Sequence, residues 1–83
     1  MKITEIKSGE IFCIGGTKSY PKLKLDIGYT DMRDEIVKRD EASMTQFECE
    51  IMTEDEIANE FKKYGMTPED ARELKTYLCI KYN

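Results

Sequence analysis

The side chains that could do chemistry in this 83-residue chain are acids, lysines, tyrosines and three cysteines, because histidine is absent. Without histidine the chain lacks the commonest general base and the usual activator of serine or cysteine nucleophiles. Cys13, Cys49 and Cys79 form no Cys-x-x-Cys pair, which argues against a zinc site. Cys13 and Cys49 stand in apolar alternations, as buried cysteines commonly do. We therefore expect no catalytic residue, no cofactor and no metal.

Two short motifs suggest chemistry and are better explained as turns. Gly15-Gly16-Thr17-Lys18-Ser19 ends like a phosphate-binding loop, but the glycines that such a loop requires are replaced by Thr17 and Phe12. We expect a Gly-Gly turn between two strands there. An enzyme that works through Asp31 and Asp34 near Arg33 is a third hypothesis for the function, although a polar hairpin turn is expected at the same residues.

The distribution of charge carries the strongest indication of function. The net charge of −4 is the sum of +2 over residues 1–39 and −6 over residues 40–83. The 21 residues from Asp40 to Glu60 contain eight acids and no Lys or Arg. The candidate partner-binding residues are these eight: Asp40, Glu41, Glu48, Glu50, Glu54, Asp55, Glu56 and Glu60.

Three interpretations of this acidic block stay open: a solvated face, a partner-binding surface and a divalent-ion site, although no Asp-x-Asp-x-Asp-Gly loop is present. Residues 54–56 fall in the first turn of an expected helix, where the helix dipole favours carboxylates without any partner. Glu48 and Glu50 are expected on one face of a strand, about 7 Å apart, where they repel unless a cation lies over them. Lys22 and Lys24 of another strand are candidates for that cation.

The elements that must position these residues are strands over residues 1–52. Alternation of apolar and polar residues predicts one strand through Leu23, Leu25, Ile27 and Tyr29, and another through Phe47, Cys49 and Ile51. The run 11–14 predicts a further strand, Ile36-Val37 another, and Ile3 with Ile6 a weaker first one. Short strands at these spacings predict a small antiparallel sheet or an open barrel.

Two short helices are predicted after the strands, at about 54–64 and 68–80. Thr53 with Glu56 and Thr67 with Asp70 have the spacing of capping boxes, and Gly65 suits the end of the first helix. Ile57, Phe61 and Tyr64 form one apolar stripe, and Ala71, Leu74 and Leu78 form the other. Residues 77–82 fit a helix or a strand equally well. The fold class is α+β, in a single domain over residues 1–83.

The helical half differs from a DNA-reading helix-turn-helix, because Ala58 and Gly65 are seven residues apart where that motif needs four. Acids also outnumber bases at the start of the second helix, so we expect no direct binding to nucleic acid. No apolar run reaches the roughly 18 residues of a membrane span, and no signal peptide is evident. We expect a cytoplasmic protein that does not bind membranes.

The first half resembles small, mostly uncharacterised proteins of phages and other mobile elements. The resemblance covers residues 7–38 and is carried by Lys7-Ser8-Gly9-Glu10-Ile11-Phe12, Gly15-Gly16, Tyr20-Pro21-Lys22-Leu23 and Gly28-Tyr29-Thr30-Asp31-Met32-Arg33. It implies an SH3-like barrel and carries over no active site. In size and charge the chain is also similar to inhibitors of host defence nucleases, the anti-CRISPR proteins among them.

We therefore expect a small acidic, non-catalytic protein that inhibits a nucleic-acid-handling host protein by engaging its basic surface, as a DNA mimic does. The alternative is a structural module, either a homodimer or a subunit of a larger complex. That alternative predicts an exposed apolar patch formed by one or more of Met44, Met52, Met66, Tyr20 and Tyr82.

Overall fold

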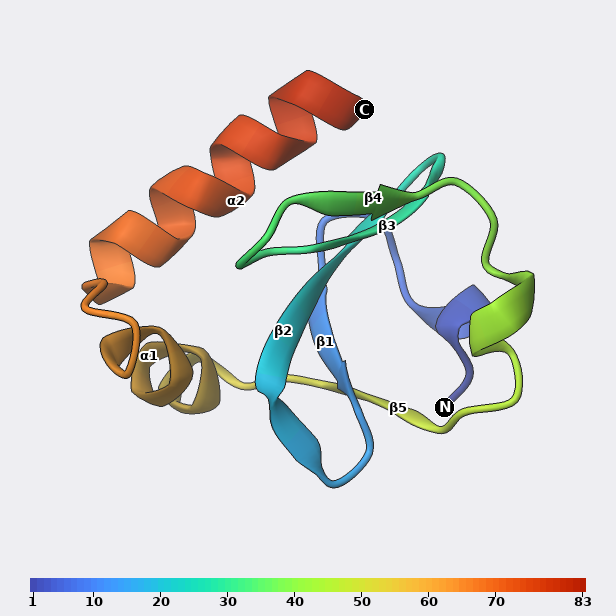
Figure 1. Ribbon diagram of the computed structural model, residues 1–83, viewed down its shortest axis with the longest axis horizontal. Helices are drawn as coiled ribbons and strands as arrows, with labels where there is room; N and C mark the ends of the chain where they lie inside the picture. Colours follow the sequence, from blue (N-terminus) through green and yellow to red (C-terminus); the bar gives the residue numbers. More distant parts are fainter.

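The computed structural model describes residues 1–83, apart from the side chain of Ser19. It is an α+β fold in which five antiparallel strands form one open sheet and two α-helices follow (Figure 1). The spatial order is β4-β3-β2-β1-β5, with β1 (Ile11–Ile14), β2 (Thr17–Leu25), β3 (Gly28–Asp31), β4 (Ile36–Lys38) and β5 (Cys49–Ile51). The helices are α1 (Glu54–Lys62) and α2 (Pro68–Tyr82), with short 3-10 turns η1 (Ile3–Glu5) and η2 (Ala42–Met44). The predicted fold class is confirmed, and the sheet does not close into a barrel.

The sheet carries an apolar core on each face. α1 and α2 cover one face, whereas η1 and η2 lie on the opposite side (Figure 1). The helix-side core consists of Ile11, Cys13, Leu23, Leu25, Met32, Met52, Phe61, Ala71 and Leu78. The opposite core consists of Ile3, Ile6, Phe12, Tyr29, Met44 and Cys49. The unbroken apolar run of β1 follows from this arrangement, because successive side chains of a strand point to opposite faces.

Both helices begin at the predicted capping boxes. Thr53 Oγ1 accepts from the Glu56 amide at 3.2 Å, and Glu56 Oε1 accepts from the Thr53 amide at 3.0 Å. Thr67 and Asp70 form the same pair of bonds at α2. After α1 the chain turns at Gly65, whose φ is +76°, and the Met66 amide donates to the Phe61 carbonyl at 3.0 Å. This is the bonding of a glycine-terminated helix end.

The C-terminal segment is helical, which decides between the helix and the strand that the sequence left open at residues 77–82. Three contacts hold this end against the sheet half of the molecule. Glu35 Oε1 accepts from Lys81 Nζ at 2.9 Å and from the Tyr82 hydroxyl at 3.1 Å. The Asn83 side chain accepts from the Asp26 amide at 2.7 Å. Among the described residues, no helix is long and apolar enough to cross a membrane.

The structure corrects the strand predicted through Leu23, Leu25, Ile27 and Tyr29. The chain turns at residues 26–27, so β2 ends at Leu25 and β3 begins at Gly28. Gly28 has a φ of +146°, and a Cβ there would lie 1.9 Å from the Lys38 carbonyl oxygen. Only glycine fits this close approach. Tyr29 pairs with Lys24 and lies on the opposite face of the sheet from Leu23 and Leu25.

Two further strand predictions are corrected. Ile3 and Ile6 lie in and beside a 3-10 turn, where a spacing of three residues places both in the same core. In the segment 47–51, Cys49 is buried, but Phe47 is 40% exposed and Ile51 is 41% exposed. β5 is an edge strand of three residues, and of these only Cys49 is buried, in the core opposite the helices.

Candidate acidic binding surface

The segment that contains all eight candidate acids crosses the molecule. In Figure 1 it runs across the lower half of the picture, from η2 on the right through β5 to α1 on the left. The acids are therefore distributed along one side of the fold. Their surroundings differ enough to divide them into acids with a cationic partner and acids without one.

Two of the acids pair with lysines of β2. Glu41 Oε1 lies 2.9 Å from Lys24 Nζ, and Lys24 is only 8% exposed and also donates to the Leu25 carbonyl at 2.8 Å. Glu56 forms an ion pair with Lys18 in addition to its capping bond. A lysine buried to this degree requires a counter-charge, so Glu41 is held in place by the fold.

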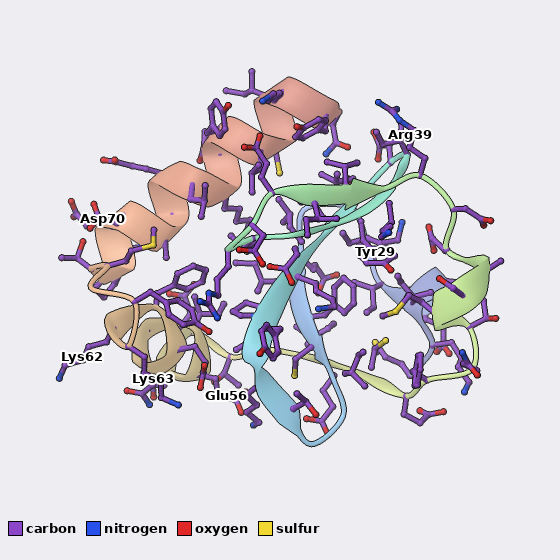
Figure 2. All side chains as sticks on the ribbon, in the orientation of Figure 1. Tyr29, Arg39, Glu56, Lys62, Lys63 and Asp70 are labelled. Atoms are coloured by element: carbon purple, nitrogen blue, oxygen red, sulfur yellow. The ribbon has the colours of Figure 1, made fainter. Side chains whose placement is uncertain are left out.

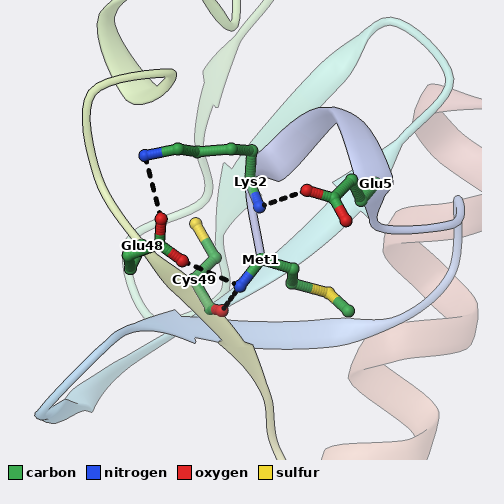
Figure 3. Close-up of polar contacts among 5 residues, drawn as sticks. All are labelled: Met1, Lys2, Glu5, Glu48 and Cys49. Carbon is green, nitrogen blue, oxygen red and sulfur yellow. Dashed lines mark hydrogen bonds and ion pairs between the residues drawn. The ribbon is translucent and has the colours of Figure 1, made fainter.

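Glu48 is neutralised by the first two residues of the chain (Figure 3). Its carboxylate lies 3.0 Å from the Met1 amino group and 3.0 Å from Lys2 Nζ. These hydrogen bonds lower the pKa of Glu48 and raise the pKa of the Met1 amino group. The expected cations for Glu48 and Glu50 were Lys22 and Lys24. That expectation is wrong for both acids, since Lys22 pairs with Asp31 and Lys24 with Glu41.

Glu60 differs from the other seven because it is buried. It is 6% exposed, and its Oε1 accepts from Lys63 Nζ at 2.8 Å, which raises the pKa of that lysine. Its Oε2 is buried and bonds to no group that the structure describes. Glu60 therefore offers no surface to a macromolecular partner.

Four acids have no ion pair with any described residue: Asp40, Glu50, Glu54 and Asp55. Asp40 accepts from the Ala42 amide at 2.9 Å, just before η2 begins. Glu50, Glu54 and Asp55 are exposed around the junction of β5 and α1. Toward the end of α1 the surface changes sign, since Lys62 is the last residue of the helix and Lys63 follows it (Figure 2). The unneutralised charge is thus concentrated at the β5–α1 junction.

The other residues that the sequence suggested for chemistry, the acids of the β3–β4 turn and the cysteines, make structural contacts. Asp31 Oδ1 accepts from the amides of Arg33 and Asp34, at 3.0 and 3.4 Å, so it holds the turn between β3 and β4. Cys13 and Cys49 are buried free thiols, and burial raises the pKa of both. Within the described part of the chain, no group of three acids or cysteines is placed to hold a metal ion.

The apolar surface differs from the one expected for a homodimer. Met44 and Met52 are each 5% exposed, and Met66 and Tyr82 pack against the helix-side core, so only Tyr20 of the five predicted residues is well exposed. Met44 is the last residue of η2 and packs into the core opposite the helices. Met52 precedes the cap of α1 at the position of a hydrophobic staple. Exposed apolar side chains lie instead at Phe47 and Ile51 near β5, and at Tyr77 and Ile80 on α2.

A cavity of about 60 Å³ lies between β1 and the two helices, lined by Ile11, Ile57 and Ala71 among others. Pockets for small ligands commonly enclose ~300–1,000 Å³, so this cavity is a packing gap.

The lysines that pair with these acids could not be assigned from the sequence, because Lys2, Lys18 and Lys24 are distant from their partners along the chain. Only Lys63, three residues after Glu60, could have been found from helical spacing. Comparison with protein-family models, with curated proteins and with solved structures finds no match to this chain.

Proposed function

We propose that the protein is a small non-catalytic binding protein that acts in the cytoplasm and engages a basic surface of a nucleic-acid-handling host protein. In this proposal it is encoded by a phage or another mobile element and inhibits its target as a DNA mimic does. The observation that carries the proposal is the concentration of unpaired carboxylates at the β5–α1 junction: Glu50, Glu54 and Asp55. A group of unpaired anionic side chains attracts a site built for phosphates.

The proposed binding surface includes fewer residues than the full block of eight acids. Glu41, Glu48, Glu56 and Glu60 already have cationic partners, so bringing them to a basic protein would require breaking an ion pair. The exposed acids at the junction carry no such cost. Their charge acts over about 8 Å at physiological ionic strength, so the attraction is strong only at close approach and weakens with salt.

Charge reversal with a matched control tests the proposal. The test variant is Glu50→Lys/Asp55→Lys, and the control is Glu69→Lys/Glu73→Lys. Asp55 and Glu69 occupy the same position in the first turns of α1 and α2, and Glu50 and Glu73 are both exposed, so the two variants change the net charge equally.

Each protein is used to capture partners from host lysate at low and at high salt, and a captured protein is then assayed for its own DNA binding. The wild type and the control should displace DNA, whereas the junction variant should bind about tenfold more weakly, since each exposed ion pair contributes ~0.2–1 kcal/mol. Equally weakened binding by both variants would show that binding depends on net charge and not on the junction. Unchanged binding by both variants would overturn the proposal.

A structural module remains the second candidate, favoured by the exposure of Tyr77 and Ile80 on the outer face of α2. It predicts self-association in sedimentation that Ile80→Lys abolishes and the junction variant leaves unchanged. A monomer at all concentrations would count against it.

A further inference from the structure

The outer edge of β5 contains one residue whose backbone groups are open to pairing. The Gly15 amide donates to the Glu48 carbonyl at 2.8 Å and the Met52 amide donates to the Ile11 carbonyl at 2.9 Å, while Cys13 is opposite Glu50. Even-numbered residues of this segment therefore direct their backbone groups toward β1. Because the direction alternates along a strand, the backbone groups of Cys49 and Ile51 point away from the sheet.

Residues on either side of Ile51 are already satisfied. The Cys49 amide donates to the Met1 carbonyl at 2.7 Å, and the Met1 amino group donates to the Cys49 carbonyl at 3.1 Å, so Met1 pairs with the edge there (Figure 3). The Thr53 amide donates to Glu56, and its carbonyl accepts from Ile57. The Ile51 N–H donates no hydrogen bond to a described residue, and the Ile51 carbonyl accepts none. An unpaired residue of this kind is a template for another strand.

The side chains at this edge indicate what would pair with it. Ile51 is 41% exposed on the face that carries Phe12, and Phe47 is exposed nearby in the chain. Glu50 lies on the other face, opposite Cys13, and has no ion pair with a described residue. A strand laid against β5 would place one side chain beside Ile51 and its neighbour beside Glu50. Cross-strand partners lie ~4.5–5.5 Å apart, close enough for an apolar contact and an ion pair.

We propose that the free edge of β5 at Ile51 receives an extended basic segment of the partner by strand addition, with an apolar residue opposite Ile51 and a Lys or Arg opposite Glu50. This inference rests on the proposed function and specifies how the acidic junction is recognised. The backbone hydrogen bonds fix the register, and the acids select the charge of the incoming segment.

A second copy of the chain fits this edge poorly. A two-fold antiparallel pair centred on Ile51 would bring together the acidic β5–α1 junctions of both copies, where Glu50, Glu54 and Asp55 have no ion pair with a described residue. Like charges brought together in this way repel. The pair would also place Thr53 of one copy opposite Cys49 of the other, the position that Met1 occupies. A basic segment is not repelled by the acids of the junction. If it is short, it also avoids the position at Cys49 that Met1 occupies.

The sharpest variant is Ile51→Pro, compared with Ile51→Ala. Proline removes the outward N–H and is tolerated on an edge strand at a position that does not donate to the ladder. Alanine removes the same apolar side chain and keeps the N–H. The probe is a capped Lys-Val-Lys peptide, short enough to fit between Met1 at Cys49 and the start of α1. It is tested beside the same peptide N-methylated at the valine, which keeps the charge and removes the N–H that would donate to the Ile51 carbonyl.

Binding is measured by fluorescence anisotropy at low salt, and the Ile51 amide is followed by hydrogen exchange in the wild type. We expect the peptide to slow exchange at Ile51, and Ile51→Pro and peptide N-methylation each to weaken binding about tenfold. The exchange measurement needs no variant, so it decides the question even where Ile51→Pro does not fold.

Strand addition fails if the peptide does not bind, or if it binds without slowing exchange at Ile51. Equal affinity of the Pro and Ala variants, together with weaker binding by Glu50→Lys/Asp55→Lys, would overturn strand addition and leave the proposed function standing. Weaker binding by Ile51→Pro than by Ile51→Ala, together with unchanged binding by Glu50→Lys/Asp55→Lys, would overturn the proposed function and leave the edge as a strand acceptor. Protection of Ile51 in a sedimenting dimer without peptide would assign the edge to a second copy instead.

Discussion

The contacts of Glu48 in the fold give it a different role from the one that its sequence position suggests. Its place in the acidic block indicates an external partner, but its carboxylate accepts hydrogen bonds from the Met1 amino group and Lys2. Both cations belong to the first two residues of the chain. Glu48 therefore ties the start of the chain to the segment before β5, and a charge reversal at Glu48 would break this link as well as remove an acid.

The pKa shifts of this pair give a pH dependence with a defined sign. The pKa of Glu48 is lowered from its ordinary value of 4.5, so its contribution to stability is present above that value and lost as the pH falls through the lower folded pKa. The pKa of the Met1 amino group is raised from 8.0, so its contribution is complete below 8.0 and lost as the pH rises through the higher folded pKa.

Comparison of the wild type with Glu48→Gln tests this sign. The free energy of unfolding in urea, measured from about pH 3 to about pH 10, should differ most between the two proteins at intermediate pH and converge at both ends. Convergence should be incomplete at high pH, because Lys2 still lies beside Glu48. Glu73→Gln, an exposed acid of α2, is the control and should show a small difference of constant size. A constant gap between the wild type and Glu48→Gln would contradict the assignment.

Among the secondary-structure elements, the two helices were predictable because their signals are local. Each begins at a Thr whose capping partner lies three residues later, and α1 is followed by Gly65. The end of α2 was not predictable, since its apolar residues also suit a strand. It is decided by contacts from residues 46 or more positions away, such as Glu35 with Lys81.

The strands were predicted less well, because alternation continues through a turn that it does not reveal. Ile27 is partly buried against the helix-side core, so the apolar pattern extends across the turn between β2 and β3. The signal for the turn was Gly28, whose conformation is required by the approach of Lys38. For β5 the pattern gave the strand but not its edge position. Edge position depends on which strands pair, and sequence alternation does not encode pairing.

The tie between the β3–β4 turn and α2 is testable at the level of the element. Glu35 has a φ of +53° and accepts from both Lys81 and the Tyr82 hydroxyl, which lowers the pKa of Glu35. Glu35→Asn keeps a residue that tolerates this φ and removes both contacts. Hydrogen exchange of the last turn of α2 should then accelerate several-fold.

Asp34→Asn is the control for this change, since the Asp34 side chain lies in the same turn and makes no ion pair or hydrogen bond with a described residue. It should leave exchange in α2 unchanged. Equal exchange in the wild type and Glu35→Asn would show that packing of Leu78 alone holds the helix end.

For the whole molecule, the acidic block was predictable as composition but not as a surface. The Lys- and Arg-free segment is real, but the fold brings lysines to it from residues 2, 18 and 24. Pairing leaves most of the free charge at the β5–α1 junction. A net charge over a segment thus limits the class of partner, whereas the location of a binding surface depends on the tertiary ion pairs.

The two cores also make a prediction about the molecule as one unit. Phe12 and Phe61 are both fully buried, on opposite faces of the sheet. The strands connect the two cores, because Ile11 and Cys13 face the helices while Phe12 between them faces η1 and η2. Loss of either core exposes one face of the same strands, so we expect the chain to unfold in a single cooperative transition.

Phe12→Leu and Phe61→Leu test this coupling, and leucine keeps most of the buried volume in a fold whose core supplies only ~3–5 kcal/mol. Each variant should lower the free energy of unfolding by on the order of 1 kcal/mol, and both should move the same transition. Helical circular dichroism should then report the same midpoint as amide exchange at Cys49, which lies in the core without helices. Tyr20→Leu, at an exposed aromatic, should change the midpoint little. If Phe12→Leu releases Cys49 while the helical signal persists, the sheet does not couple its two faces, and the molecule contains two units that unfold separately.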